Sequence, residues 1–168
     1  MPFDHSYLTL AHSNLLCASQ SKGHVVDKFI HLIKLSVGSE SVETLIDWQT
    51  TGALRTPQGH PCHVTRMWPK RAAELLQGGS IYWVIKGSIQ CRQRILGLEE
   101  VFGSDGIRRC AIVLDPQVHR THTALKRPFQ GWRYLKPEDA PADLPENRAQ
   151  DDALPDELNR ALVEIGIL

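Results

Sequence analysis

The 168-residue chain lacks several features by which common classes of protein are recognised. No stretch approaches the roughly 18 consecutive apolar residues that a membrane-spanning helix needs. The first twenty residues contain no lysine or arginine, and Asp4, His5 and His12 interrupt any apolar run, so they do not resemble a signal peptide. The four cysteines are too few and too scattered for a secreted disulfide scaffold. We therefore expect a soluble, cytoplasmic protein without a membrane partner.

Motifs for several kinds of chemistry are also missing. The sequence has no Cys-x-x-Cys or His-Glu-x-x-His zinc motif, no glycine-rich phosphate loop and no Gly-x-Ser-x-Gly nucleophile motif. His119 and His122 would point to opposite faces of a strand, and Cys62-His63 is a single pair. We therefore expect neither a metal nor a cofactor, and the sequence assigns no catalytic residues.

The distribution of charge is the most informative global feature. The net charge is zero, but residues 64–136 hold thirteen basic and five acidic residues, a net charge of +8. Residues 1–63 carry a net charge of −1, and residues 137–168 carry −7. Such asymmetry indicates either a polyanionic partner or an acidic tail that lies on a basic body.

Length and composition favour one folded domain with tails. Hydrophobic residues make up 42% of the chain and charged residues 23%, which is usual for globular proteins. Residues 1–27 show weak periodicity and are predicted to be a poorly ordered arm. A single domain is expected over residues 28–136. Residues 137–168 are predicted to be an acidic linker and a C-terminal amphipathic helix that begins at Pro155 and places Leu158, Leu162 and Ile165 on one stripe.

Short strands and two helices are predicted within the central domain. One helix is expected from an N-cap at Ser39 to about Gln49, and a second over residues 69–77, between Pro69 and Gly78. Residues 52–62 are predicted to be a loop, and Gly87 and Ser104-Asp105-Gly106 to be turns. Strands are expected at 29–37, 63–68, 80–86, 88–95 with a continuation to 102, 107–114, and within 117–136. The expected fold class is α+β, with a small, mostly antiparallel sheet or barrel and two or three flanking helices.

A polar stripe on two of these strands is a candidate binding surface. Alternation places Ile81, Trp83 and Ile85 on an apolar face and leaves Tyr82 as the freer ring. It likewise places Ile89, Cys91 and Ile95 on one face of the next strand. The opposite face would carry Lys86, Ser88, Gln90, Arg92 and Arg94, which span about 26 Å in an extended chain and suit a nucleic-acid backbone. The solvated face of a half-buried sheet explains the same pattern.

Two further groups of cations are candidates. Residues 126–134 interleave cations with aromatic rings, and Arg127, Trp132 and Arg133 are typical of sites that pair phosphates and stack on bases. In the alternative interpretation, Phe129 and Trp132 fill the core. Arg66, Lys70 and Arg71 surround the predicted start of the short helix, where free N–H groups favour anions. Ordinary surface cations are the simpler explanation of this last group.

The order of residues also resembles known families. The chain resembles an uncharacterised bacterial family that is known only as a domain of unknown function. The segments that carry this resemblance are HLIKL (31–35), TRMWPKR (65–71), GGSIYWVIKG (78–87), RQRILG (92–97), RCAIVLDP (109–116) and RPFQGWRYLKPEDAP (127–141). A weaker resemblance, to the EVE and ASCH members of the PUA-like superfamily, rests on residues 72–77, 79–85, 96–101 and 110–115. It implies a PUA-like β-barrel over residues 28–136 that binds RNA or modified bases.

These observations predict a module that binds RNA or a modified nucleotide. One alternative is a small ASCH-like hydrolase acting on a modified nucleoside, with Thr65, Lys70, Lys86 and Glu99 as candidate acid, base or nucleophile. Another is a protein-interaction module in which the acidic residues 137–157 mask the basic body. The residues expected to contact nucleic acid are Arg66, Lys70, Arg71, Lys86, Arg92, Arg94, Arg127, Trp132 and Arg133.

Overall fold

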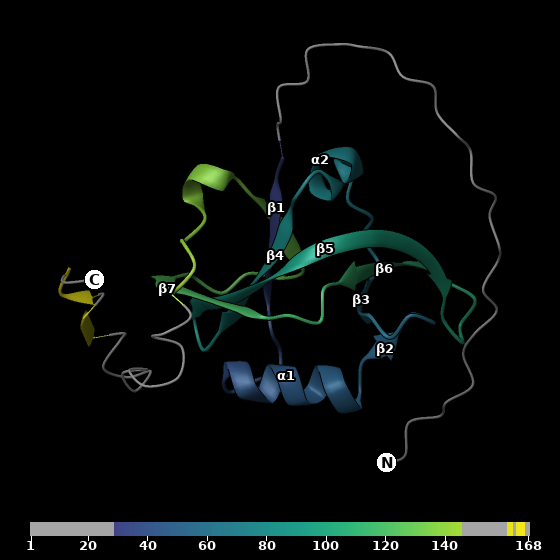
Figure 1. Cartoon of the computed structure of the whole chain (residues 1–168). Helices are drawn as coiled ribbons and strands as arrows, with labels where there is room; N and C mark the ends of the chain where they lie inside the picture. The colour runs from purple at the N-terminus through teal and green to yellow at the C-terminus, as the bar shows by residue number, and fades with distance from the viewer. Residues whose placement is uncertain (1–28, 146–160, 163, 167–168) are drawn as a thin grey trace, which may run out of the picture.

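The computed structural model describes residues 29–145, 161–162 and 164–166 of the chain (Figure 1). Two helices and eight strands account for most of the described residues. In chain order they are β1 (His31–Leu35), α1 (Val42–Thr51), β2 (Leu54–Arg55), β3 (Pro61–Thr65), α2 (Ala72–Leu76), β4 (Ser80–Ile85), β5 (Ser88–Phe102), β6 (Arg108–Leu114), β7 (His119–Leu125) and β8 (Trp132–Leu135), followed by a 3-10 turn at Pro137–Asp139.

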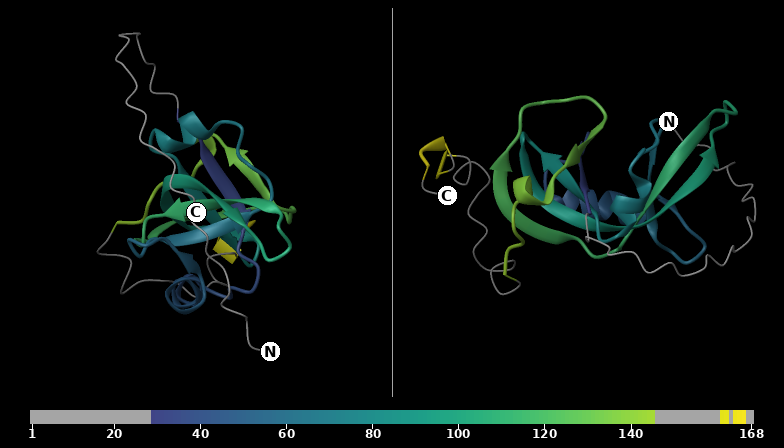
Figure 2. Two further views of the ribbon diagram at one scale, coloured as in Figure 1. Left: turned by 90° about the vertical axis from the view of Figure 1, so that its right-hand side faces the viewer. Right: turned by 90° about the horizontal axis from the view of Figure 1, so that it is seen from above.

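All eight strands belong to one sheet with the order β2-β3-β6-β5-β4-β1-β8, and β7 pairs with β5 outside this path. Every pairing is antiparallel except that of β1 with β4. The 15-residue strand β5 joins the two halves of the sheet and is visibly curved in Figures 1 and 2. The predicted α+β class, with a mostly antiparallel sheet and flanking helices, is confirmed. The sheet is open, because the strands at its two ends, β2 and β8, do not pair with each other.

Helix α1 begins two residues later than its sequence pattern predicted. Ser41 is the N-cap, and its hydroxyl accepts a hydrogen bond from the Thr44 backbone N–H. The Thr44 hydroxyl in turn accepts from the Ser41 N–H at 3.0 Å, which completes a reciprocal capping box. The proposed cap, Ser39, instead hydrogen-bonds through its hydroxyl to Ser36. The helix runs to Thr51, two residues beyond the expected end at about Gln49, and is closed by Gly52, whose N–H donates to the Trp48 carbonyl.

Helix α2 is shorter than predicted and begins at Ala72 instead of Pro69. Residues 69–71 are held outside the helix, where the Arg71 N–H donates to the Tyr134 hydroxyl at 3.0 Å. The turn that follows the helix requires glycine. A Cβ atom at Gly79 would lie 2.4 Å from the Ile30 carbonyl oxygen and 2.5 Å from that of Leu75. The predicted loop at 52–62 also needs correction, since it contains β2 and the start of β3.

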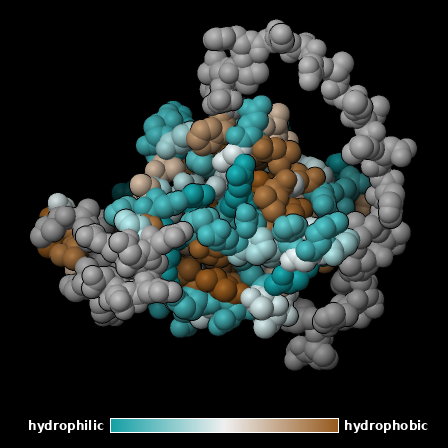
Figure 3. Space-filling model, in the orientation of Figure 1, coloured by the Kyte–Doolittle hydropathy of each residue, from teal (hydrophilic) through white to brown (hydrophobic). Residues whose placement is uncertain are grey.

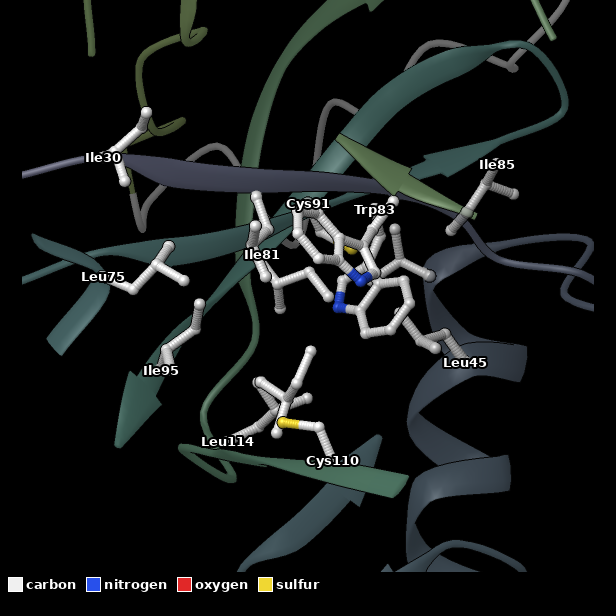
Figure 4. Close-up of a cluster of buried hydrophobic side chains, with 14 residues drawn as sticks. Ile30, Leu45, Leu75, Ile81, Trp83, Ile85, Cys91, Ile95, Cys110 and Leu114 are labelled. Atoms are coloured by element: carbon white, nitrogen blue, oxygen red, sulfur yellow. The ribbon is translucent and has the colours of Figure 1, made fainter. Parts of the chain in front are cut away.

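The main core lies between one face of the sheet and the two helices (Figure 4). Leu45 of α1 and Leu75 of α2 meet side chains from β4, β5 and β6 there. A second, smaller cluster covers the opposite face. It contains Ile33, Tyr82, Val84, Ile89 and Leu135.

Strand β4 is therefore buried on both faces, which corrects two predictions. Tyr82 is only 5% exposed and is not a free ring. A β-bulge also separates Ile89 from Cys91, because Val84 pairs with Ile89 while Trp83 pairs with Cys91, which leaves Gln90 as the extra residue. Ile89 thus joins the second cluster, whereas Cys91 lies in the main core.

Several predictions concern the ends of the chain. The proposed arm at 1–27, residues 146–152 of the linker, and Pro155 and Leu158 of the last helix lie outside the described residues. Near the C-terminus, the Ile165 N–H donates to the Ala161 carbonyl, as in one helical turn, and the Ile165 side chain is exposed. No helix within the described part of the chain has the length and apolar character needed to cross a membrane.

Candidate nucleic-acid interface

Residues 119–145 surround the second cluster, and we call them the frame. Strand β7 pairs with β5, and the loop 126–131 then leads to β8, beside β1. Residues 136–145, the return segment, lead back to β7, where the His122 N–H donates to Ala142 and the Leu144 N–H to Arg120, both at 2.9 Å. Phe129 of the loop and Ala140 of the return segment pack on the second cluster. The frame therefore covers this face of the sheet.

Six cations of residues 64–136, which we call the basic segment, form ion pairs with carboxylates. These pairs neutralise much of the positive charge that the sequence concentrates in residues 64–136. They are Arg71–Glu74, Arg92–Asp143, Arg108–Glu100, Arg109–Asp105, Arg120–Glu43 and Lys136–Glu138.

The other seven cations of the segment form no ion pair with any residue that the structure describes: Arg66, Lys70, Lys86, Arg94, Lys126, Arg127 and Arg133.

Four of these seven cations gather at one end of the frame, which we call the basic end: Lys86, Lys126, Arg127 and Arg133. Lys86 and Gly87 have φ values of 47° and 83° and form the two-residue turn between β4 and β5. The Lys126 N–H donates to the Gly87 carbonyl at 2.8 Å, which places residues 126 and 127 beside this turn. The Arg133 guanidinium lies over the Phe129 ring at 5.0 Å, and Phe129 packs on the cluster that includes Val84 and Ile89.

Two more unpaired cations adjoin β8 from the side of the main core. The Trp132 indole N–H donates to the Met67 carbonyl at 3.1 Å, and the Arg71 N–H donates to Tyr134. These bonds tie residues 66–71 to β8 and bring Arg66 and Lys70, both exposed, next to this edge of the sheet.

The predicted anion site at the start of the short helix is not formed as expected. Helix α2 has only five residues and starts beyond Pro69. The Arg71 guanidinium contacts both carboxylate oxygens of Glu74, at 2.6 and 2.5 Å, and lies over the Tyr134 ring. Arg71, which was expected to bind an anion, is therefore already paired with Glu74 of α2.

The continuous polar stripe predicted from Lys86 to Arg94 is also absent. Lys86 lies in the turn, Ser88 is 1% exposed, and Gln90 is the bulged residue. Arg92 contacts Asp143 and the Ser80 hydroxyl. Arg94 is exposed and pairs with Ser80 at the far end of β4 from the turn.

Trp132 occupies the main core, as the alternative interpretation of residues 126–134 held. Its side chain is buried, and its ring packs edge-to-face on Tyr134 with centroids 5.1 Å apart. The indole is therefore not available for stacking on a base, while Arg127 and Arg133 are exposed.

Buried titratable groups give little support for acid–base chemistry. Burial lowers the pKa of His31 to about 4, with a smaller contribution from Arg92, and the His31 ring nitrogen Nδ1 accepts from the Ser80 N–H at 3.0 Å. Burial likewise lowers the pKa of His63 to about 4, with a smaller effect of Lys34. Burial also raises the pKa of the Cys91 thiol to about 12. Near pH 7 both imidazoles are neutral and this thiol is protonated.

The residues considered for a hydrolase are not brought together. Thr65 and Glu100 both pair with Cys110, so Thr65 and Glu99 lie on opposite faces of the sheet. Lys86 is exposed in its turn and forms no ion pair with a carboxylate of the described residues. Within the same part of the chain, no three His, Cys, Asp or Glu residues are grouped so that they could hold a metal ion.

The sequence did not indicate all the cations that are neutralised, because two of the six carboxylate partners are distant along the chain. Asp143 lies 51 residues from Arg92, and Glu43 lies 77 residues from Arg120. The turn at Lys86-Gly87 had a local signal, since a glycine separates two alternating segments, and it is confirmed. Figure 3 shows one face of the molecule, on which separate apolar areas lie among hydrophilic ones.

Comparison with known proteins identifies the family. The family model described as "Protein of unknown function (DUF1489)" matches residues 32–168. The chain therefore belongs to this family, as the segments quoted in the sequence analysis indicated. No curated protein and no solved structure matches the chain significantly.

Proposed function

We propose that this protein binds RNA through the cations around β8. The basic end would contact the sugar-phosphate backbone, and Arg66 and Lys70 would extend the contact along the other side of the strand. The observation that carries the proposal is that these cations have no carboxylate partner among the described residues, whereas six neighbours in the same segment do. Unpaired guanidinium and ammonium groups bind phosphates without first losing a protein partner.

The mode of binding follows from the side chains available. Arg133 is held over the Phe129 ring, so less conformational entropy is lost when its planar guanidinium pairs with a phosphate. Two aromatic rings of residues 126–134 are not free to stack on a base, since Trp132 lies in the core and Phe129 lies beneath Arg133. We therefore expect backbone contacts to dominate, with strong salt dependence and little base preference.

The hydrolase alternative has no comparable support. Thr65 and Glu99 lie on opposite faces of the sheet, and the exposed Lys86 forms no ion pair with a carboxylate of the described residues. Recognition of a modified nucleotide stays open as a specific form of RNA binding, and a comparison of modified with unmodified oligonucleotides would test it.

A salt series with a labelled single-stranded RNA tests the proposal. For single strands, each phosphate contact contributes about −0.7 to the slope of log K against log salt. The variant Arg127→Gln/Arg133→Gln should reduce the magnitude of the slope by about 1.4 if each residue holds one phosphate. The matched control, Arg108→Gln/Lys136→Gln, removes the same charge from two exposed cations that are already ion-paired, and it should leave the slope nearly unchanged.

Two results would reject RNA binding at this surface. One is the absence of binding by the unmodified protein at low salt. The other is an equal loss of slope in the two double variants, which would show that total charge matters and the location of the cations does not.

A further inference from the structure

The return segment places a carboxylate on an arginine of the second face. Arg92 donates from Nε to one oxygen of Asp143 at 2.6 Å and from a terminal nitrogen to the other oxygen at 2.5 Å. Its remaining terminal nitrogen contacts the Ser80 hydroxyl at 3.1 Å. A two-point contact of this kind is also how arginine binds a phosphate group.

Arg92 lies in line with Arg133, one of the four cations of the basic end. Strand pairing aligns Arg133 with Ile33, Ile33 with Tyr82, and Tyr82 with Arg92, so all four side chains share one face of the sheet. Three strand spacings separate the two arginines by about 14 Å. Ile33 and Tyr82, between them, belong to the cluster on which Ala140 of the return segment packs.

The contacts of the return segment can be exchanged for those of a ligand. Two backbone hydrogen bonds hold it to β7, from the His122 N–H to Ala142 and from the Leu144 N–H to Arg120. The Asp143 side chain is 37% exposed, so solvent and ions reach the pair. Residues 137–168 carry a net charge of −7, so an approaching polyanion repels this segment while it attracts Arg92.

We propose that Arg92 and Ser80 form a phosphate-binding position, which the Asp143 carboxylate occupies until an RNA phosphate replaces it. Replacement of Asp143 would extend the basic end across the sheet to Arg92 and would uncover Tyr82 between the two arginines. This inference rests on the proposed RNA binding and adds to it a site that the protein's own acidic segment keeps closed.

The variant Asp143→Asn tests the competition in the full chain with a labelled oligouridylate. An amide of similar shape pairs weakly with Arg92, so RNA no longer has to displace a carboxylate, and affinity should rise about three- to fivefold. The matched control is Glu138→Gln, which removes one negative charge from an exposed ion pair of the same segment and should give a smaller rise. The double variant Arg92→Gln/Asp143→Asn should lose the gain, because the phosphate then has no guanidinium to bind.

A second measurement uses the unmodified protein and does not depend on the folding of any variant. Hydrogen exchange at the His122 and Leu144 amides should accelerate when RNA saturates the protein, because their partners lie in the return segment and in the strand that it leaves.

Equal gains from Asp143→Asn and Glu138→Gln, a gain that persists without Arg92, or unchanged protection in the saturated complex would each overturn the inference while RNA binding stands. Absence of RNA binding by the unmodified protein at low salt would reject the proposed function itself.

Discussion

Replacement of Gln93 by leucine is expected to destabilise the fold strongly, although leucine has a similar volume and a greater hydrophobicity. Gln93 is fully buried, and its carbonyl oxygen accepts from the Gln49 amide at 2.7 Å and from the Trp83 indole at 2.9 Å. Its own amide donates to the Gln49 oxygen at 2.8 Å and to the Asp115 carbonyl at 3.0 Å. These four bonds join α1, β4 and the end of β6 to the middle of β5.

The magnitude follows from the groups left without partners. Gln49 is 5% exposed and Trp83 is 2% exposed, so neither can turn to water without disruption of the core. A buried polar group without a partner costs roughly 1–3 kcal/mol. Two such groups give about 2–6 kcal/mol, to which the partly buried Asp115 carbonyl adds little. This loss is a large fraction of the roughly 5–15 kcal/mol by which domains are stable.

Urea unfolding followed by far-ultraviolet circular dichroism measures the effect. Gln77→Leu, at an exposed position, is the matched control and should change the unfolding free energy by less than about 0.5 kcal/mol. In the double variant Gln49→Leu/Gln93→Leu, the amide that lacks a partner in each single variant is also removed. The loss of unfolding free energy should therefore be smaller than the sum of the two single losses by about 1–3 kcal/mol. A loss below about 1 kcal/mol in Gln93→Leu, or additive single effects, would refute the reasoning.

Two other predictions concern stability. Gly79→Ala should destabilise the fold by more than about 2 kcal/mol in the same unfolding assay, because the new methyl group meets two backbone carbonyl oxygens that a rotamer change cannot move. Gly97→Ala is its control, since the nearest atoms there lie at 3.7 Å, and an equal loss in both variants would contradict the steric argument. Stability should also fall as the pH is lowered from about 6.5 to about 4, because the pKa of His31 is lowered to about 4 in the folded state and the unfolded chain binds the proton first. This difference is worth up to about 3 kcal/mol. His31→Gln should make the urea midpoint depend less on pH, and the dependence that remains comes from His63, whose pKa is also lowered to about 4. His122→Gln, at an exposed position, should leave the dependence unchanged.

The sequence predicted those elements whose causes are local. The strand at 107–114 and the turn before it are confirmed, since apolar residues and Ser104-Asp105-Gly106 specify them within a few positions. The predicted start of α1 was wrong by two residues, because a second serine, Ser41, is the N-cap and forms the capping box with Thr44 three residues later.

Features that depend on distant residues were missed. Alternation identified one apolar face of β4, but the other face is buried as well, because Phe129 and Ala140 of the frame pack on the cluster to which Tyr82 belongs. The bulge at Gln90 then reversed the expected orientation of Ile89, since one extra residue changes the face of every side chain on that side of it. Neither effect has a signal within the strand itself.

The same distinction between local and distant partners determines what the charge asymmetry means. Of the six carboxylates that pair with the basic segment, Glu43, Glu138 and Asp143 come from outside residues 64–136. The net charge of +8 therefore describes neither the folded surface nor a single binding face. The charge that remains for a ligand is that of the seven cations without ion pairs to described residues, and six of them adjoin either β8 or the turn beside the frame. A surface for polyanions is thus defined by the pairs that the fold makes elsewhere, and Asp143 belongs both to those pairs and to the acidic segment. For this reason Arg92, which the sequence placed in the middle of the binding stripe, would become available only when the return segment leaves it.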